Sequence, residues 1–147
     1  MSDARKTWMG LLAKAPPETL RRLWDDSGLA PGFTWLRAPE IGSTMVQGRI
    51  GGTGAPFNLG EMTVTRCALK LRDAGTIGHA YVQGRDKTHA RIAALVDALM
   101  QTAQDRRLRV AILDPLAADH AAHRRALAGE AAATRVDFFT MVRGEDQ

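Results

Sequence analysis

Residues 49–60, RIGGTGAPFNLG, combine four glycines, a threonine and an arginine, a composition that could hold a phosphate group. Successive backbone N–H groups in a glycine-rich turn can surround an anion, and Arg49 and Arg66 flank the segment. It is not a P-loop, because the Gly-Lys-Ser/Thr ending is missing, and it lacks the third glycine of a dinucleotide fingerprint. The residues that follow also predict a strand, whereas both motifs open a helix. Two interpretations stay open: an anion nest, or a hairpin connection that uses positive φ angles. The residues concerned are Gly51, Gly52, Thr53 and Gly54.

A second basic cluster, GRDKTHA, places Arg85, Lys87 and His89 around the expected start of a helix. Free N–H groups and partial positive charge gather at a helix N-terminus, so further cations there oppose the dipole unless an anion lies between them. The cluster is therefore a candidate anion site. The alternative is that Asp86 is a plain N-cap and that its basic neighbours are solvated.

The remaining polar residues predict no catalytic centre and no metal site. His120 and His123 have a spacing that can bind zinc, but no third ligand is evident, and the adjoining arginines favour a solvated helical face. The single cysteine, Cys67, excludes an internal disulfide and is typical of a small core residue. The basic stretch at residues 106–109 has no interleaved aromatic residues, so it is weak evidence for nucleic-acid binding.

Helices are expected at both ends of the chain. Near the N-terminus, Trp8, Leu11, Leu12 and Ala15 form one amphipathic stripe, and a short second helix with Leu20, Leu23 and Trp24 on one face ends at Gly28. Residues 87–104 predict the strongest helix, with Asp86 as N-cap and a buried stripe of Ile92, Leu95, Val96 and Leu99. Another helix is expected from Asp114, as N-cap, to about Thr134.

Between these helices lie four segments rich in β-branched and aromatic residues: FTWLRA, STMVQGRI, EMTVTRCALKLR and TIGHAYVQG. Short connections without an intervening helix indicate an antiparallel meander. RVAILDP could add a fifth strand, and the apolar stretch within RVDFFTMVRGEDQ predicts a strand or a docking segment. The expected class is therefore α+β: a single domain, residues 1–147, in which helices flank an antiparallel sheet.

Composition limits the class of partner without selecting one. The 147 residues carry a net charge of +4, and 45% of them are apolar, as in an ordinary globular protein. A positive balance permits anionic partners such as nucleotides, phosphorylated metabolites, nucleic acid or an acidic protein surface. No apolar run is long enough to span a membrane, and the start lacks the features of a signal peptide, so we expect a cytoplasmic protein.

Three blocks resemble one known family. The strings RIGGTGAPFNLGEMTVTRCALKL, GHAYVQGRDKTHARIAALVDALMQ and TRVDFFTMVRGED closely resemble the PhnG family, a subunit of the bacterial carbon–phosphorus lyase machinery, and the N-terminal WMGLLAKA is similar as well. The blocks cover most of the chain, and the helix of residues 116–133 is the least diagnostic part. Tyr81 departs from the tryptophan expected at its position but keeps an aromatic surface.

The resemblance implies a supporting role in phosphonate catabolism. Members of the family work with PhnH, PhnI and PhnJ, and functionally with PhnL, in a step that displaces adenine from ATP by an alkylphosphonate to give a ribose 1-phosphonate 5-triphosphate. The iron–sulfur cluster of the pathway belongs to the partner PhnJ. The resemblance thus implies no cofactor on this chain, while ATP and the alkylphosphonate are substrates of the complex.

The same residues then have two possible roles. Arg49, Arg66, Arg85, Lys87, His89 and Arg143 could form polar subunit contacts or an anion pocket at a shared active site. The alternative from another class is a small basic module that binds nucleic acid or another anion. The apolar segments at the two ends of the chain suit docking on a partner.

Overall fold

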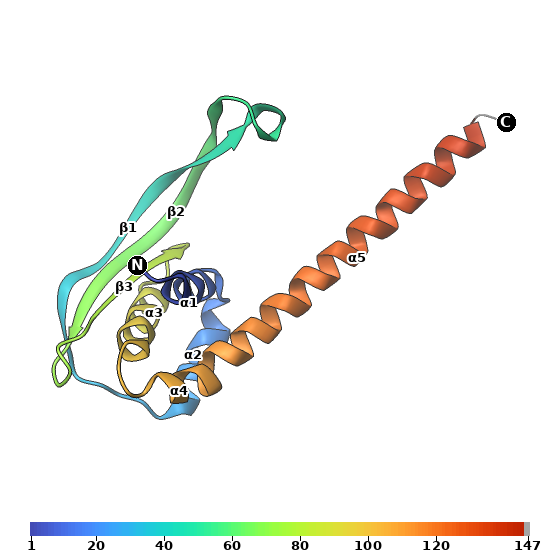
Figure 1. The fold of residues 1–147 in the computed structure, drawn as a ribbon. Helices are drawn as coiled ribbons and strands as arrows, with labels where there is room; N and C mark the ends of the chain where they lie inside the picture. The colour runs from blue at the N-terminus through green and yellow to red at the C-terminus, as the bar shows by residue number, and fades with distance from the viewer. Residues whose placement is uncertain (146–147) are drawn as a thin grey trace. The chain divides into compact units, whose positions relative to one another are not determined.

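The structure, a computed structural model, describes the backbone of residues 1–145 and the side chains of residues 1–131. The chain forms two compact units, Met1–Leu116 and the part from Ala117 onward. The elements follow in the order α1 (Asp3–Lys14), α2 (Pro17–Ser27), β1 (Phe33–Arg49), η1 (Ile50–Gly52), β2 (Pro56–Leu71), β3 (Ile77–Gln83), α3 (Lys87–Met100), α4 (Asp105–Leu108), η2 (Arg109–Leu113) and α5 (Asp114–Glu145) (Figure 1).

The sheet of the first unit is an antiparallel meander in the order β1-β2-β3, so the predicted α+β class is confirmed. Three strands replace the four that were expected, because the first two segments form one continuous strand of 17 residues. Pro39 lies in this strand at a register shift, between Arg37 and Glu40. A proline is tolerated there because β1 is an edge strand and the pairing is locally irregular.

Helix α3 packs across β2 and β3 and forms the centre of the core (Figure 1). The side chains of β3 alternate: Gly78, Ala80 and Val82 are buried towards α3, whereas their neighbours in the strand are exposed. The predicted stripe of α3 is buried, and so is most of the rest of the helix. Asp86 caps α3 as predicted, since its carboxylate accepts a hydrogen bond from the backbone N–H of His89 at 2.9 Å.

The two N-terminal helices close the core. Leu12, Leu20 and Trp24 are buried from the predicted faces, and Gly28 ends α2 with a φ of 70°, as expected for a left-handed C-cap. Pro17 occupies the first turn of α2, where a missing N–H costs nothing. The predicted stripes of both helices therefore fix how the N-terminus covers the core.

One buried carboxylate joins three elements. Asp97 of α3 accepts hydrogen bonds from Arg5 Nη2 at 2.9 Å and from Trp8 Nε1 at 2.8 Å, both on α1. It also accepts the backbone N–H of His79, on the outer edge of β3, at 2.9 Å. The hydrogen bond from Arg5 to Asp97 raises the pKa of the guanidinium. The side chain of Asp97 is fully buried, so this network compensates the cost of removing the charge from water.

The C-terminal third differs from expectation at three points. RVAILDP is helical, since Leu108, Ile112 and Leu116 are buried at helical spacing, and a short apolar run cannot distinguish strand from helix. Asp114 has helical φ and ψ angles of −64° and −46° and lies inside a continuous helical run, so it is not an N-cap. The segment with the apolar stretch is part of α5 and is not a strand. Whether it docks depends on side chains outside the described residues.

Candidate functional site

The glycine segment forms the tip of a long hairpin between β1 and β2 (Figure 1). Gly51 and Gly52 have φ angles of 64° and 82°, which glycine adopts without strain. The backbone N–H of Gly54 donates to the carbonyl of Ile50 at 2.7 Å, and Arg49 Nη1 donates to the carbonyl of Gly54 at 3.3 Å. The tip is thus a hairpin connection closed by its own hydrogen bonds, and the anion nest stays a prediction.

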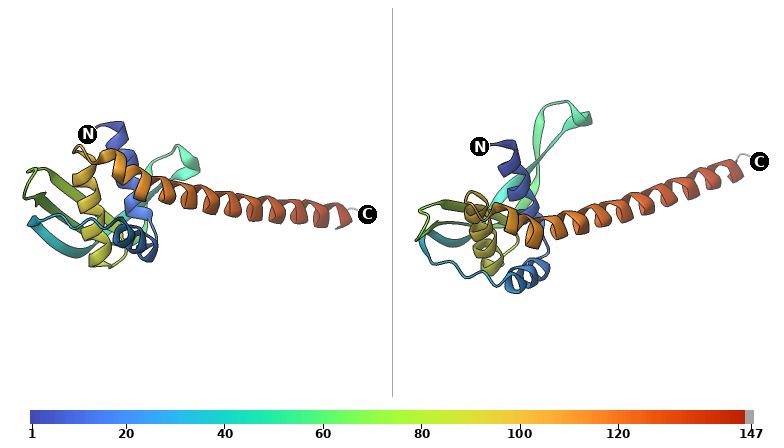
Figure 2. Two further views of the ribbon diagram at one scale, coloured as in Figure 1. Left: turned by 90° about the horizontal axis from the view of Figure 1, so that it is seen from below. Right: turned by 60° about the horizontal axis from the view of Figure 1, so that its bottom comes forward.

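The hairpin extends well beyond the rest of the sheet, as Figure 1 and Figure 2 both show. The pairing of β2 with β3 begins at Val64, opposite Gln83. Residues 42–63, which lie between this point and its partner on β1, therefore form a two-stranded outer ribbon. No residue of this outer ribbon is buried within the described chain. Its exposed apolar side chains are Met45, Val46, Ile50, Phe57 and Leu59. Such a concentration of exposed apolar surface marks an interaction site.

The outer ribbon is also nearly free of charge. Arg49 and Glu61 are its charged residues. Phe57 and Leu59 lie over Gly48, where an added Cβ would approach Leu59 to 3.1 Å and Phe57 to 3.2 Å. The absence of a side chain at Gly48 therefore gives these two side chains their place on one face of the outer ribbon.

Where the outer ribbon joins the three-stranded sheet, a polar row crosses the face opposite α3. Arg66 of β2 pairs with Glu40 of β1 on one side and with Tyr81 of β3 on the other. Glu40 accepts from Arg66 Nε at 3.4 Å and forms ion pairs with Arg66 at 3.3 Å and Arg37 at 3.6 Å. All of these side chains are exposed, so the ion pairs contribute little to stability and are available for contact.

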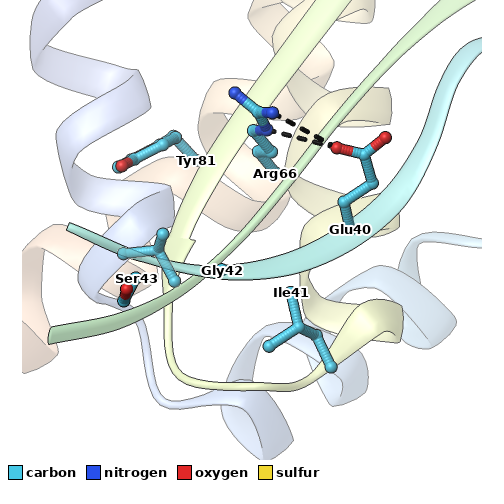
Figure 3. A pocket seen from close by; sticks show the side chains of 7 residues that line it. Glu40, Ile41, Gly42, Ser43, Arg66 and Tyr81 are labelled. Carbon is cyan, nitrogen blue, oxygen red and sulfur yellow. Dashed lines mark hydrogen bonds and ion pairs between the residues drawn. The ribbon is translucent and has the colours of Figure 1, made fainter.

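A groove of about 200 Å³ lies beside this row (Figure 3). Its lining includes Glu40, Ser43, Val64, Arg66 and Tyr81, and Figure 3 shows the ion pair of Arg66 with Glu40 at its rim. A second groove of about 200 Å³ lies between α1 and β3, where Met9, Gly10 and Ala13 face the edge of β3. Tyr81 lines both grooves and is 49% exposed.

The basic cluster at the start of α3 is a separate place. Arg85 and Lys87 are exposed and make no hydrogen bond or ion pair within the described part of the chain. Asp86 forms an ion pair of 3.7 Å with Arg21 of α2, a residue that sequence reasoning did not connect to this cluster. The cap carboxylate is thus already partnered, and Arg85 and Lys87 are left available to an external group.

His89 differs from the other candidates, because it lies in the core with 2% of its surface exposed. Its Nε2 lies 2.7 Å from the carbonyl oxygen of Leu12, to which the ring N–H donates, and Nδ1 has no hydrogen-bond partner among the described residues. The expectation of a surface contact is corrected here: the third helical position turns this side chain inward, where it joins α3 to α1.

The structure therefore distributes the predicted residues instead of gathering them. Arg49 and the glycines lie at the hairpin tip, Arg66 lies on the sheet, and Arg85 and Lys87 lie at the start of α3. Arg143 is part of α5, and its side chain lies outside the described residues. Sequence reasoning missed Glu40 and did not assign a role to Tyr81, although the alternation along residues 67–72 already separated an exposed face of β2 from a buried one.

The described residues were also compared with the requirements of a metal site and of a membrane-spanning helix. Its His, Cys, Asp and Glu side chains include no group of three or more placed to hold a metal ion. None of its helices has the length and apolar character needed to cross a membrane.

Comparison with known proteins assigns the family. The model of the family described as phosphonate metabolism protein PhnG matches residues 3–144. A protein of Rhizobium meliloti (strain 1021), alpha-D-ribose 1-methylphosphonate 5-triphosphate synthase subunit PhnG, is 49% identical over 142 residues, which cover 97% of this chain and 90% of the relative. The match includes the hairpin, the polar row and α3, and the chain therefore belongs to the PhnG family of phosphonate metabolism proteins.

Proposed function

We propose that this chain is a supporting subunit of a ribose 1-phosphonate 5-triphosphate synthase in the carbon–phosphorus lyase pathway. The complex would displace adenine from ATP by an alkylphosphonate. Family membership and the name of the relative, a synthase subunit, support this function. They also make it a better hypothesis than the nucleic-acid-binding module that the positive charge alone permits.

The observation that carries the supporting role is the outer ribbon. Its apolar side chains, with Leu59 at 62% and Phe57 at 42% exposed, have no cover within the described chain. An uncovered edge strand with apolar side chains is a hazard for a protein that acts alone, and natural proteins cover such edges. A subunit that enters a stable complex meets this requirement.

The partners and location complete the proposal. PhnI, PhnH and PhnJ would form the complex with this chain, PhnL would act with them, and the assembly would work in the cytoplasm. This chain would carry no cofactor, and the iron–sulfur cluster of the pathway would lie on PhnJ. ATP and the alkylphosphonate would bind to the complex.

For Arg85 and Lys87, we propose a subunit contact in preference to a substrate contact. Both side chains are exposed and unpartnered in the described part of the chain, and neither lines the grooves beside the polar row, between α1 and β3, or beside Pro31 and Leu71. Cations that neutralise a triphosphate converge on one pocket, whereas contacts to a partner can be spread over a surface.

Reconstitution of the complex tests both statements. The chain and its Arg85→Ala and Lys87→Ala variants would be combined with PhnH, PhnI, PhnJ and PhnL, and assembly and ATP-dependent phosphonate ribosylation would be measured separately. We expect the variants to weaken assembly, with activity falling in proportion. Intact assembly with lost activity would assign these residues to a shared active site. Full activity of the complex without this chain would refute the proposed function.

A further inference from the structure

The outer ribbon has two chemically different faces. Strand alternation and the pairing of Val46 with Gly60 and of Thr44 with Met62 place Thr44, Val46, Gly48, Phe57, Leu59 and Met62 on one face, named here the uncharged face. Both charged residues, Arg49 and Glu61, alternate to the opposite face together with Met45. The outer ribbon is therefore amphipathic, although no part of it packs on the core.

The uncharged face continues into the polar row. Val64 pairs with Gly42, and the next exposed position along β2 is Arg66, so the same side of the sheet carries apolar side chains at one end and charges at the other. The charged end carries three cations, Arg37, Arg66 and Lys70, and one carboxylate, Glu40. Tyr81 pairs with Arg66 and lines two grooves, each of which could take a partner side chain. Tyrosine and arginine, together with tryptophan, are enriched at the energetic centres of protein interfaces.

We propose that the uncharged face and the polar row form one docking surface for a partner subunit that presents an apolar strip ending in carboxylates. This inference rests on the function proposed above, and it adds which side of the hairpin is covered and by what chemistry. The excess of cations over Glu40 calls for acidic groups opposite the row. The uncharged face calls for an apolar strip beside them.

A protein fits this surface better than the other possible occupants. Nucleic acid would need cations along the outer ribbon, but its single cation, Arg49, alternates away from the uncharged face. A membrane would accept the apolar side chains, but basic residues close to them normally accompany binding to anionic lipids. Here the cations lie at one end and share a carboxylate, a pattern that suits side-chain pairing across a protein interface.

Two adjacent positions of β1 allow a matched test. Val46 and Met45 are 37% and 46% exposed, they lie next to each other, and they point to opposite faces. In the reconstituted complex, Val46→Asp should raise the dissociation constant of this chain by at least about 30-fold, because an interface hot spot is disrupted. Met45→Asp should change it by less than about 3-fold, the level of a contact at the rim. Circular dichroism and thermal melting of each isolated variant would verify folding.

A charge reversal tests the acidic partner. Lys70→Glu should slow association about 10-fold, with the difference from the wild-type chain shrinking at high salt. Arg91→Glu is the control, because Arg91 is exposed on α3, which packs on the other side of the sheet. An equal effect of both reversals would show that net charge acts, and would overturn the acidic-partner assignment.

The remaining outcomes each decide a point. If the wild-type chain assembles and Val46→Asp behaves like Met45→Asp, whether both bind or both fail, the docking surface is wrong while the proposed function stands. If the wild-type chain does not assemble, the proposed function fails and the inference fails with it. A dimer of the isolated chain that Val46→Asp dissolves would replace the partner subunit by a second copy. Binding to phosphatidylcholine–phosphatidylserine vesicles that the same variant abolishes would replace it by a lipid surface.

Discussion

Strand β2 passes through two different environments, and the contrast separates what folds this protein from what it presents to others. Residues 64–70, the inner half of the strand, lie between β1 and β3 and pack against α3, and most of their side chains are buried. Residues 56–63 pair only with β1, and none of their side chains is buried. The outer half is also poorer in β-forming residues, since it contains Pro56, Asn58 and Gly60, and its strand conformation depends on its pairing with β1.

The difference teaches where stability resides. Burial of apolar surface contributes about 25 cal/mol per Å², and in this chain that contribution comes from the inner half of the hairpin with α1, α2 and α3. The outer ribbon contributes little to the fold of the isolated chain, yet it retains large apolar side chains. Substitutions should therefore separate into two groups, those that affect folding and those that affect assembly.

The largest expected effect on folding is at Gly78. A Cβ at this position would overlap the carbonyl oxygen of Ala94 and lie 2.8 Å from the Cβ of Ala98, so β3 and α3 would have to move apart. We expect Gly78→Ala to reduce the free energy of unfolding by more than about 4 kcal/mol, measured by urea denaturation. Gly42→Ala in the outer ribbon is the control, because a Cβ added there would meet no other atom within 4 Å. Similar free energies of unfolding for the two variants would contradict the close packing of β3 on α3.

Loss of the buried carboxylate should be the next largest effect. Asp97→Ala leaves the Arg5 guanidinium and the indole N–H of Trp8 without their partner, and we expect a loss of about 3–5 kcal/mol. Asp73→Ala, in the exposed turn after β2, should change stability by less than about 0.5 kcal/mol. Chemical denaturation of both variants gives the comparison, and a mild effect at Asp97 would show that α1 is held by its apolar face alone.

Two leucines on β2 directly test the contrast between its inner half and the outer ribbon. Leu69 is fully buried in the inner half, so Leu69→Ala should cost about 2–5 kcal/mol. Leu59 is 62% exposed in the outer ribbon, so Leu59→Ala should cost less than about 0.5 kcal/mol in the isolated chain. Thermal or urea unfolding of the isolated variants measures both values. Comparable losses would mean that the outer ribbon contributes to the core after all.

The smallest expected effect is a pH dependence in the inner half. Burial raises the pKa of the Cys67 thiol from 9.0 to about 11. Because the thiol loses its proton more readily in the unfolded chain, its contribution is complete below about pH 9 and is lost as the pH rises towards 11, by at most about 3 kcal/mol. The difference in unfolding free energy between the wild-type chain and Cys67→Ala, followed from pH 8 to 11, isolates this term. A difference that stays constant with pH would contradict it.

Local signals in the sequence were sufficient for much of the inner fold. The N-cap at Asp86, the helix end at Gly28 and the stripe from Ile92 to Leu99 each depend on residues close together in the chain. The alternation at residues 67–71 identified the half-buried part of β2, with the small residue Ala68 buried on the second face as well. These features could be predicted because their physical causes are local.

Features that depend on distant residues could not be predicted in this way. The roles of Asp97 and His89 follow from the docking of α1, whose contacts with α3 join residues 77 to 92 positions apart. The continuity of β1 through Pro39 depends on its position at the sheet edge. The polar row requires the register of three strands, and for this reason Arg66 was found without Glu40. The helical state of residues 109–113 depends on burial against α2.

The network at Asp97 also has a consequence for the order of events during synthesis. Helix α1 has 12 residues, too few for a stable helix in water, and its carboxylate partner lies 92 positions after Arg5. Helix α1, the first to leave the ribosome, therefore becomes stable only after α3 has been synthesised. Until then the outer edge of β3, with its free His79 N–H, has no cover and can pair with other chains. We expect the nascent protein to be most prone to aggregation in this interval, and its N-terminus, although made first, to be among the last parts to settle.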